Sequence, residues 1–165
     1  MFWLRLLFAI NIFLGAFLLF LVEPMAARQL LPVLGGSAAV WITCLVFFQS
    51  ALLLGYLYAH QGSRRVIWAV HITLLLAAVL EAARWSYTHL AMDNASDHPV
   101  WSVFKELSAW IGVPFIVLAA TSPLLQLWWA RVESGEIPWR LYALSNIASL
   151  FALALYPSVV EPHLT

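Results

Sequence analysis

The sequence holds very little charge. Asp, Glu, Lys and Arg make up 10% of its 165 residues, whereas soluble domains are usually about a quarter charged. Eight basic and eight acidic residues cancel, so no strong field attracts nucleic acid or an acidic substrate. Apolar residues reach 64% and the mean hydropathy is +0.89. This composition excludes an ordinary soluble domain and indicates a multi-pass membrane protein.

Cysteine and catalytic motifs are equally scarce. The single cysteine, Cys44, excludes an internal disulfide and a cysteine-based metal cluster. The sequence has no glycine-rich phosphate loop, no Gly-x-Ser-x-Gly, no His-Glu-x-x-His and no Cys-x-x-Cys-His haem motif. We therefore expect no catalytic residue and no metal site, and the sequence favours a non-enzymatic role.

Long apolar runs dominate what is present. Five of them have about the length that a transmembrane helix needs: Leu6–Val22, Ala38–Ala59, Val66–Ala82, Trp110–Ala130 and Leu141–Val160. Tryptophans lie near the ends of these runs, as in an interfacial belt: Trp41, Trp68, Trp85, Trp110, Trp128, Trp129 and Trp139. The pattern predicts an all-α fold, a single membrane domain over residues 1–165 with about five transmembrane helices and short interfacial helices.

The loops give an orientation through their basic residues. With the N-terminus in the cytoplasm, five basic residues fall on the inner side and three on the outer side. The inner set is Arg5, Arg64, Arg65, Arg131 and Arg140; the outer set is Arg28, Arg84 and Lys105. We therefore expect a cytoplasmic N-terminus and a C-terminus on the outer, periplasmic face.

Two apolar runs end in the same polar pair, Glu-Pro, at Glu23 and at Glu161. Pro24 is expected to end the first helix, because proline cannot continue the hydrogen-bond ladder. The segment Pro24–Ser37 would then lie in the outer interface or tuck back against the bundle, with Ser37 capping the next helix. The predicted orientation places both pairs on the outer side, so Glu23, Arg28 and Glu161 are expected to form one charged cluster.

The outer stretch Ala83–Ala109 is the longest expected loop. Within it, "VWSVFKELSAW" sets Trp101, Phe104 and Leu107 at helical spacing, with Lys105 facing away. This segment is either an interfacial helix on the outer leaflet or an N-terminal extension of the fourth transmembrane helix.

The polar residues inside the apolar runs are neutral: Asn11, Gln49, Thr121, Ser122 and Asn146. They either hydrogen-bond between helices or line a polar path for a substrate. Pro114 and Pro123 predict a kink in the fourth helix, where Thr121 and Ser122 are placed to satisfy the carbonyl groups that proline frees.

His71 lies inside the third run. An imidazole there is a candidate ligand for the iron of a haem or the magnesium of a chlorophyll. The alternative is a hydrogen bond to a neighbouring helix. No other cofactor is expected.

Two long blocks carry a family resemblance. "FLLFLVEPMAARQLLPVLGGSAAVWITCLVFFQSALLLGYLYAH" resembles the opening of bacterial polytopic membrane proteins of the spermidine synthase-like type, including fused transporter/spermidine synthase chains. "TSPLLQLWWAR" and "IPWRLYALSNIASLFALALYPSVVEPHLT" resemble a later block of the same family. The resemblance implies a bacterial inner-membrane protein whose relatives carry a soluble aminopropyltransferase-like domain. That domain is absent from this sequence, so its activity is not carried over.

Three functional hypotheses follow. The leading one is a non-catalytic inner-membrane subunit or scaffold of a larger membrane assembly, with membrane lipids and other membrane subunits as partners and no nucleic acid. The alternative is a transporter, or half of one, with a polar path near mid-membrane. The third is a haem- or pigment-binding subunit that uses His71.

Overall fold

The computed structural model describes residues 2–34, 36–61, 66–85, 99–132 and 139–163. Within these ranges all regular elements are helical and no strand occurs. The longer helices are α1 (Phe2–Leu34), α2 (Ala38–Gln61), α3 (Val66–Trp85), α4 (Pro99–Leu107), α5 (Val113–Val132) and α6 (Trp139–Leu155). A π-helical turn, η1 (Ser108–Gly112), follows α4. A second π-helical turn, η2 (Tyr156–Val160), and a 3-10 turn, η3 (Glu161–His163), follow α6. The predicted all-α helical bundle is confirmed.

Four helical stretches in the described part of the chain are long and apolar enough to cross a membrane: Trp3–Leu30, Ala38–Gln61, Val100–Val132 and Trp139–His163. The protein is therefore a membrane protein by the length and composition of its helices. The third expected crossing falls on α3, a helix of 20 residues, which is about the length that a crossing needs; the apolar stretch found among its described side chains is Ala69–Leu80. A fifth crossing by α3 stays a prediction.

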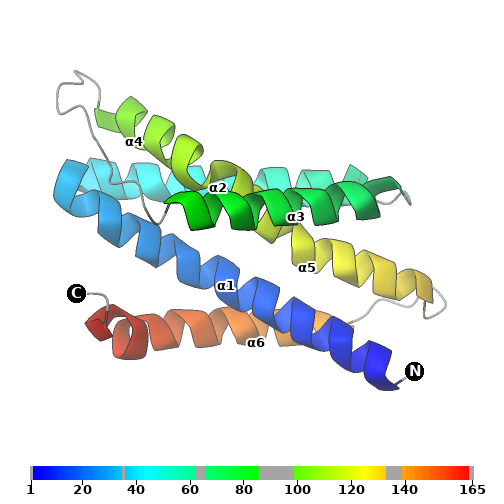
Figure 1. Cartoon of the computed structure of the whole chain (residues 1–165). Helices are drawn as coiled ribbons and strands as arrows, with labels where there is room; N and C mark the ends of the chain where they lie inside the picture. Colours follow the sequence, from blue (N-terminus) through cyan, green and yellow to red (C-terminus); the bar gives the residue numbers. More distant parts are fainter. Residues whose placement is uncertain (1, 35, 62–65, 86–98, 133–138, 164–165) are drawn as a thin grey trace.

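Successive helices run in opposite directions along the bundle when the continuous run from α4 to α5 is taken as one (Figure 1). α1 crosses diagonally between α6 on one side and the α2–α3 layer on the other. α5 packs against α1, α2 and α3, which makes it the central helix of the bundle. The start of α1 and the η3 turn lie at opposite ends of the molecule.

The first helix does not end at Pro24. α1 continues as one helix of 33 residues through Pro24 to Leu34, so the expected helix end at Pro24 is wrong. Proline removes one backbone hydrogen bond, but the continued helix buries Ala26, Ala27 and Leu30 in the core. Burial of that apolar face stabilises the continuation, and it lengthens α1 well beyond the expected Val22.

The N-terminus of α2 follows the sequence prediction. The Ser37 hydroxyl accepts a hydrogen bond from the backbone N–H of Val40 at 3.3 Å. The Ser37 carbonyl accepts the first helical bond, from the N–H of Trp41 at 3.2 Å. This geometry is that of a helix N-cap.

The segment before the fourth expected helix is an extension of that helix. α4 runs through the π-helical turn η1 directly into α5, so residues 99–109 are helical and not part of a loop. Pro114 follows the turn, and its ring would crowd the carbonyl four residues earlier in a regular helix. The wider π-helical turn relieves that contact, and the chain changes direction there (Figure 1).

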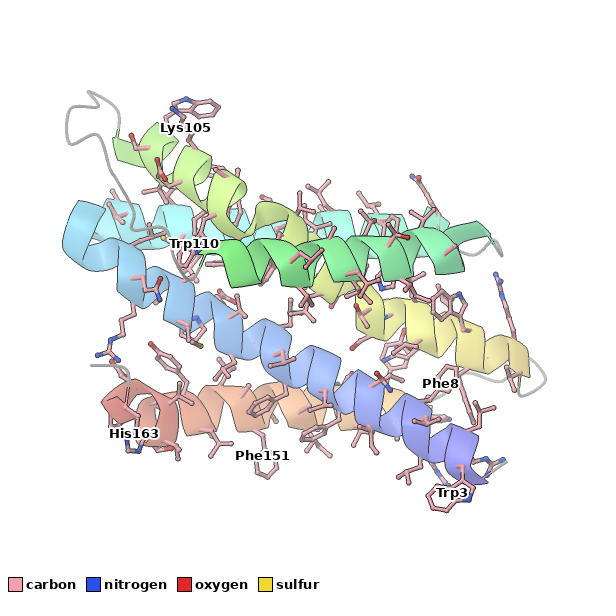
Figure 2. The ribbon with its side chains drawn as sticks, in the orientation of Figure 1. Trp3, Phe8, Lys105, Trp110, Phe151 and His163 are labelled. Carbon is pink, nitrogen blue, oxygen red and sulfur yellow. The ribbon has the colours of Figure 1, made fainter. Side chains whose placement is uncertain are left out.

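The buried face of α4 differs from the expected one. Val103 and Leu107 are fully buried, whereas Trp101 is 71% exposed. α4 packs mainly against α2, so its inner face is set by that neighbour. Lys105 points outward, as predicted (Figure 2).

Trp128 and Trp129 lie within about one turn of the end of α5 at Val132, as the sequence predicts. Trp128 and Trp129 are each only 8% exposed and pack inside the bundle. Phe8 of α1 contacts Trp129, with 5.1 Å between the ring centroids, and Figure 2 shows Phe8 near the α5 side of α1. Trp110 lies within the continuous helical run and not at its end.

Small residues bring α2 and α5 together. Ala51, Gly55 and Ala59 repeat at four-residue spacing on the buried face of α2. A Cβ atom placed on Gly55 would lie 2.7 Å from the Cβ of Ala119 and 2.9 Å from the carbonyl oxygen of Ile116. Small residues at this spacing allow close approach of two membrane helices, and here the approach depends on Gly55.

Candidate functional site

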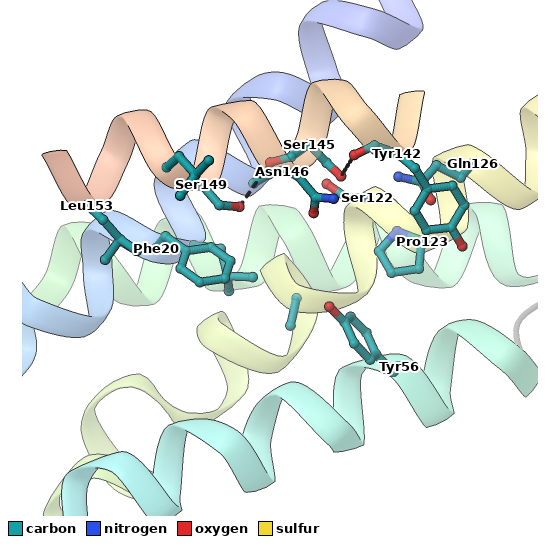
Figure 3. A pocket seen from close by; sticks show the side chains of 14 residues that line it. Phe20, Tyr56, Ser122, Pro123, Gln126, Tyr142, Ser145, Asn146, Ser149 and Leu153 are labelled. Atoms are coloured by element: carbon teal, nitrogen blue, oxygen red, sulfur yellow. Dashed lines mark hydrogen bonds between the residues drawn. The ribbon is translucent and has the colours of Figure 1, made fainter. Parts of the chain in front are cut away.

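A cleft with a volume of about 540 Å³ lies between α1, α2, α5 and α6. α6 packs extensively along α1 but touches α5 only sparsely. The resulting gap is lined by neutral polar side chains from three helices: Tyr56, Ser122, Gln126, Tyr142, Ser145, Asn146 and Ser149. Figure 3 shows these side chains directed toward the shared space.

The serine hydroxyls of the cleft donate their protons to backbone carbonyls. Ser149 Oγ donates to the carbonyl of Ser145 at 2.9 Å, and Ser145 Oγ donates to that of Tyr142 at 3.0 Å. Ser122 Oγ reaches across to the carbonyl of Ile12 on α1 at 3.3 Å. Because a hydroxyl oxygen keeps two lone pairs, each serine remains able to accept a hydrogen bond from a molecule in the cleft.

Gln126 was missed by the sequence reasoning. Its side chain is only 5% exposed and lines the cleft, and no residue in the described part of the chain hydrogen-bonds to it. The signal was available as a lone amide in the apolar run "PLLQLWW". An amide offers two donors and one acceptor oxygen, and Gln126 is the more buried of the two amides that line the cleft, since Asn146 is exposed.

The structure gathers only part of the predicted polar path. Ser122 and Asn146 share the cleft. Asn11 is exposed on the outside of α1, where its Nδ2 donates to the carbonyl of Leu7 at 2.8 Å. Gln49 lies elsewhere, on a second, small cavity. Sequence spacing could not separate these positions, because it does not show which face of each helix meets which neighbour.

Glu23 shares that second cavity with Gln49. The cavity has a volume of about 20 Å³ and is otherwise lined by apolar side chains of α1, α2 and α5. Its volume is enough for one water molecule. In the described residues the Glu23 carboxylate has no hydrogen-bond or ion-pair partner.

The two Glu-Pro pairs do come together, as predicted, but not through an ion-pair cluster. Arg28 Nη1 donates to the backbone carbonyl of Glu161 at 2.6 Å, and the Tyr156 hydroxyl donates to the carbonyl of Pro24 at 3.2 Å. Glu23 takes no part in these contacts. On a continuous helix a five-residue separation turns two side chains about 140° apart, so Glu23 and Arg28 face different neighbours.

Thr121 faces away from the cleft, toward α3. Its hydroxyl donates to the carbonyl of Val117 at 2.9 Å and lies 3.2 Å from His71 Nε2. Since the threonine proton is used on Val117, the imidazole is the donor in the second contact. The freed carbonyl expected from Pro123 is that of Ala119, so neither Thr121 nor Ser122 satisfies it as predicted.

His71 is 3% exposed and is enclosed by aromatic rings. The Tyr58 ring lies 5.8 Å away and the Trp128 ring 6.3 Å away, measured between centroids. In the described structure His71 Nδ1 and the Tyr58 hydroxyl are buried without a hydrogen-bond partner. With Nε2 donating to Thr121, Nδ1 is the nitrogen left for a haem or chlorophyll metal, and such a ligand stays a prediction.

No group of three or more His, Cys, Asp or Glu side chains within the described ranges is placed to hold a metal ion. Comparison with known proteins found no matching family model, no matching curated protein and no matching solved structure. The site is therefore interpreted from its own chemistry.

Proposed function

We propose that the protein is an integral membrane subunit that contributes one half of a polar path for small molecules to a larger membrane assembly. The observation that supports this role is the cleft between α5 and α6. Its polar side chains lie within helices that are apolar enough to span a membrane, and unsatisfied polar groups are costly in the hydrocarbon region. Such groups need water, a ligand or a further helix as partner.

The open side of the cleft supports the subunit part of the role. Tyr56, Tyr142 and Leu150 at its rim are about half or more exposed. A path that is open along one side is incomplete until other membrane helices cover it. The proposed role is binding and passage of a small molecule, without a chemical reaction.

The proposed location is the bacterial inner membrane, with the N-terminus in the cytoplasm and the C-terminus in the periplasm. The distribution of basic residues supports that orientation. The resemblance of the sequence to spermidine synthase-like membrane proteins supports the bacterial origin.

Cysteine labelling in membranes tests the path. Cys44 is the one cysteine of the sequence and is buried. A Cys44→Ala background therefore has no cysteine of its own, and single cysteines can be introduced and labelled in it. Ser149→Cys in the cleft should react with a charged methanethiosulfonate reagent, because a thiol reacts as the thiolate and needs water. Ile147→Cys, on the exposed outer side of the same helix, is the matched control and should stay unmodified in lipid.

Equal reactivity of Ser149→Cys and Ile147→Cys would refute a hydrated cleft. The subunit part is tested separately by affinity purification from native membranes in a mild detergent. Recovery of the chain as a lone monomer would count against a larger assembly.

A further inference from the structure

The lining of the cleft carries no charge. None of the side chains that line it is Asp, Glu, Lys, Arg or His. A charged ligand in a site of low dielectric constant needs an opposite charge or a metal. The described lining offers neither, which favours an uncharged ligand.

One end of the cleft is polar. Gln126 and Tyr142 lie together at this end (Figure 3). Gln126 is nine-tenths buried and has no hydrogen-bond partner in the described structure. The Gln126 amide is accessible from the cleft, and it would pair with a ligand group that both donates and accepts a hydrogen bond.

The other end is apolar. Along α6 the lining changes from Tyr142 and Ser145 to Leu150 and Leu153. Phe20 of α1 lies opposite Leu153 at this end (Figure 3). The cleft thus has a polar end and an apolar end. Its exposed rim lies within helices that are apolar enough to span a membrane, so a molecule dissolved in the membrane can enter the cleft from the side.

We propose that the cleft binds an uncharged amphiphile, with a hydroxyl or amide head group on Gln126 and an apolar tail against Phe20 and Leu153. This inference rests on the proposed function and names its ligand class. A polycation such as spermidine does not meet the requirement, because no carboxylate lines the cleft.

Photo-crosslinking tests the ligand class on the purified full chain in detergent. Three probes carry the same diazirine-labelled acyl or alkyl tail and differ only in head group: a monoacylglycerol, a fatty acid and an alkylamine. Mass spectrometry maps the cross-linked residues. The monoacylglycerol should enrich cross-links at Leu150, Leu153 and Phe20 several-fold over exposed positions such as Leu76 on α3, and excess spermidine should not compete.

Gln126→Leu should abolish the enrichment while leaving general lipid cross-linking unchanged. If that variant does not fold, Asn146→Leu replaces it, since Asn146 is an exposed lining residue. Equal enrichment for all three probes, or cross-links spread evenly over the outer surface, would overturn the proposal. If the probe cross-links at the cleft but Ser149→Cys is not labelled, the proposed ligand class stands and the hydrated path of the proposed function is refuted.

Discussion

Gly55 offers the sharpest test of the packing. Replacement by alanine adds one methyl group to α2 at its closest approach to α5. The new Cβ atom would lie 2.7 Å from the Cβ of Ala119, about 1 Å inside an ordinary carbon–carbon contact of roughly 3.5–4.0 Å. Two backbone atoms also lie close, the oxygen of Ile116 at 2.9 Å and the nitrogen of Ala120 at 3.2 Å, and backbone cannot rotate away.

The two helices must therefore separate or shear. Overpacking of this kind costs about 1–3 kcal/mol, while alanine in place of glycine favours the helix by up to about 1 kcal/mol. The movement would also loosen the contact between Phe48 of α2 and Phe115 of α5, whose centroids are 5.0 Å apart. We expect Gly55→Ala to lower the free energy of unfolding by about 1–2 kcal/mol.

The measurement is unfolding in mixed detergent micelles, followed by circular dichroism as the fraction of denaturing detergent rises. Gly36→Ala is the matched control, because a Cβ on Gly36 meets no atom within 4 Å. Ala119→Gly should partly rescue Gly55→Ala by removing the 2.7 Å contact, although Ile116 and Ala120 remain. Full stability of Gly55→Ala, or equal damage from Gly36→Ala, would refute the close approach.

Three further predictions concern the polar groups. Glu23→Gln removes an unpartnered carboxylate from a mostly apolar cavity and should raise the free energy of unfolding by about 1–2 kcal/mol. The control Glu161→Gln, at an exposed position, should leave the free energy of unfolding unchanged. A loss of stability in Glu23→Gln would contradict the conclusion that the Glu23 carboxylate is unpaired. Arg28→Ala removes one of the two hydrogen bonds that join the end of α6 to α1, the other being that of Tyr156, and should speed amide hydrogen exchange in η2 and η3; unchanged exchange there would show that the Arg28 contact does not hold that end. His71→Phe and Thr121→Val should each change the free energy of unfolding by only about 1 kcal/mol, and their effects should be non-additive in the double variant. Additive effects would disprove their hydrogen bond. A Soret or chlorin band in the purified wild-type protein that His71→Phe abolishes would establish the predicted pigment ligand.

The polar residues show where sequence reasoning reaches its limit. Gln49, Thr121 and Asn146 are equally conspicuous in the apolar runs, yet they face three different neighbours. A helix with apolar residues on all sides has no amphipathic pattern to mark its inner face. Only packing decides which polar side chain meets a cavity, a histidine or another helix.

The helix boundaries show the same limit from the backbone side. Pro24 predicts an end to the first helix, but α1 continues through it. Near Pro114 the kink is real, yet it is absorbed by the π-helical turn η1, which joins α4 to α5. A proline sets a local cost, and the burial that offsets this cost is a property of the packed bundle.

The sequence by itself determined the class of protein and most of the helices. Its scarce charge and long apolar runs require helices that satisfy their own backbone hydrogen bonds, and the Ser37 cap follows from local chemistry alone. The tertiary structure decided that the two Glu-Pro pairs meet through Arg28 and Tyr156, that Gly55 sets the spacing of α2 and α5, and that Gln126 faces a cleft. Those outcomes depend on which helix faces touch, and helices that are apolar on every side do not encode that locally.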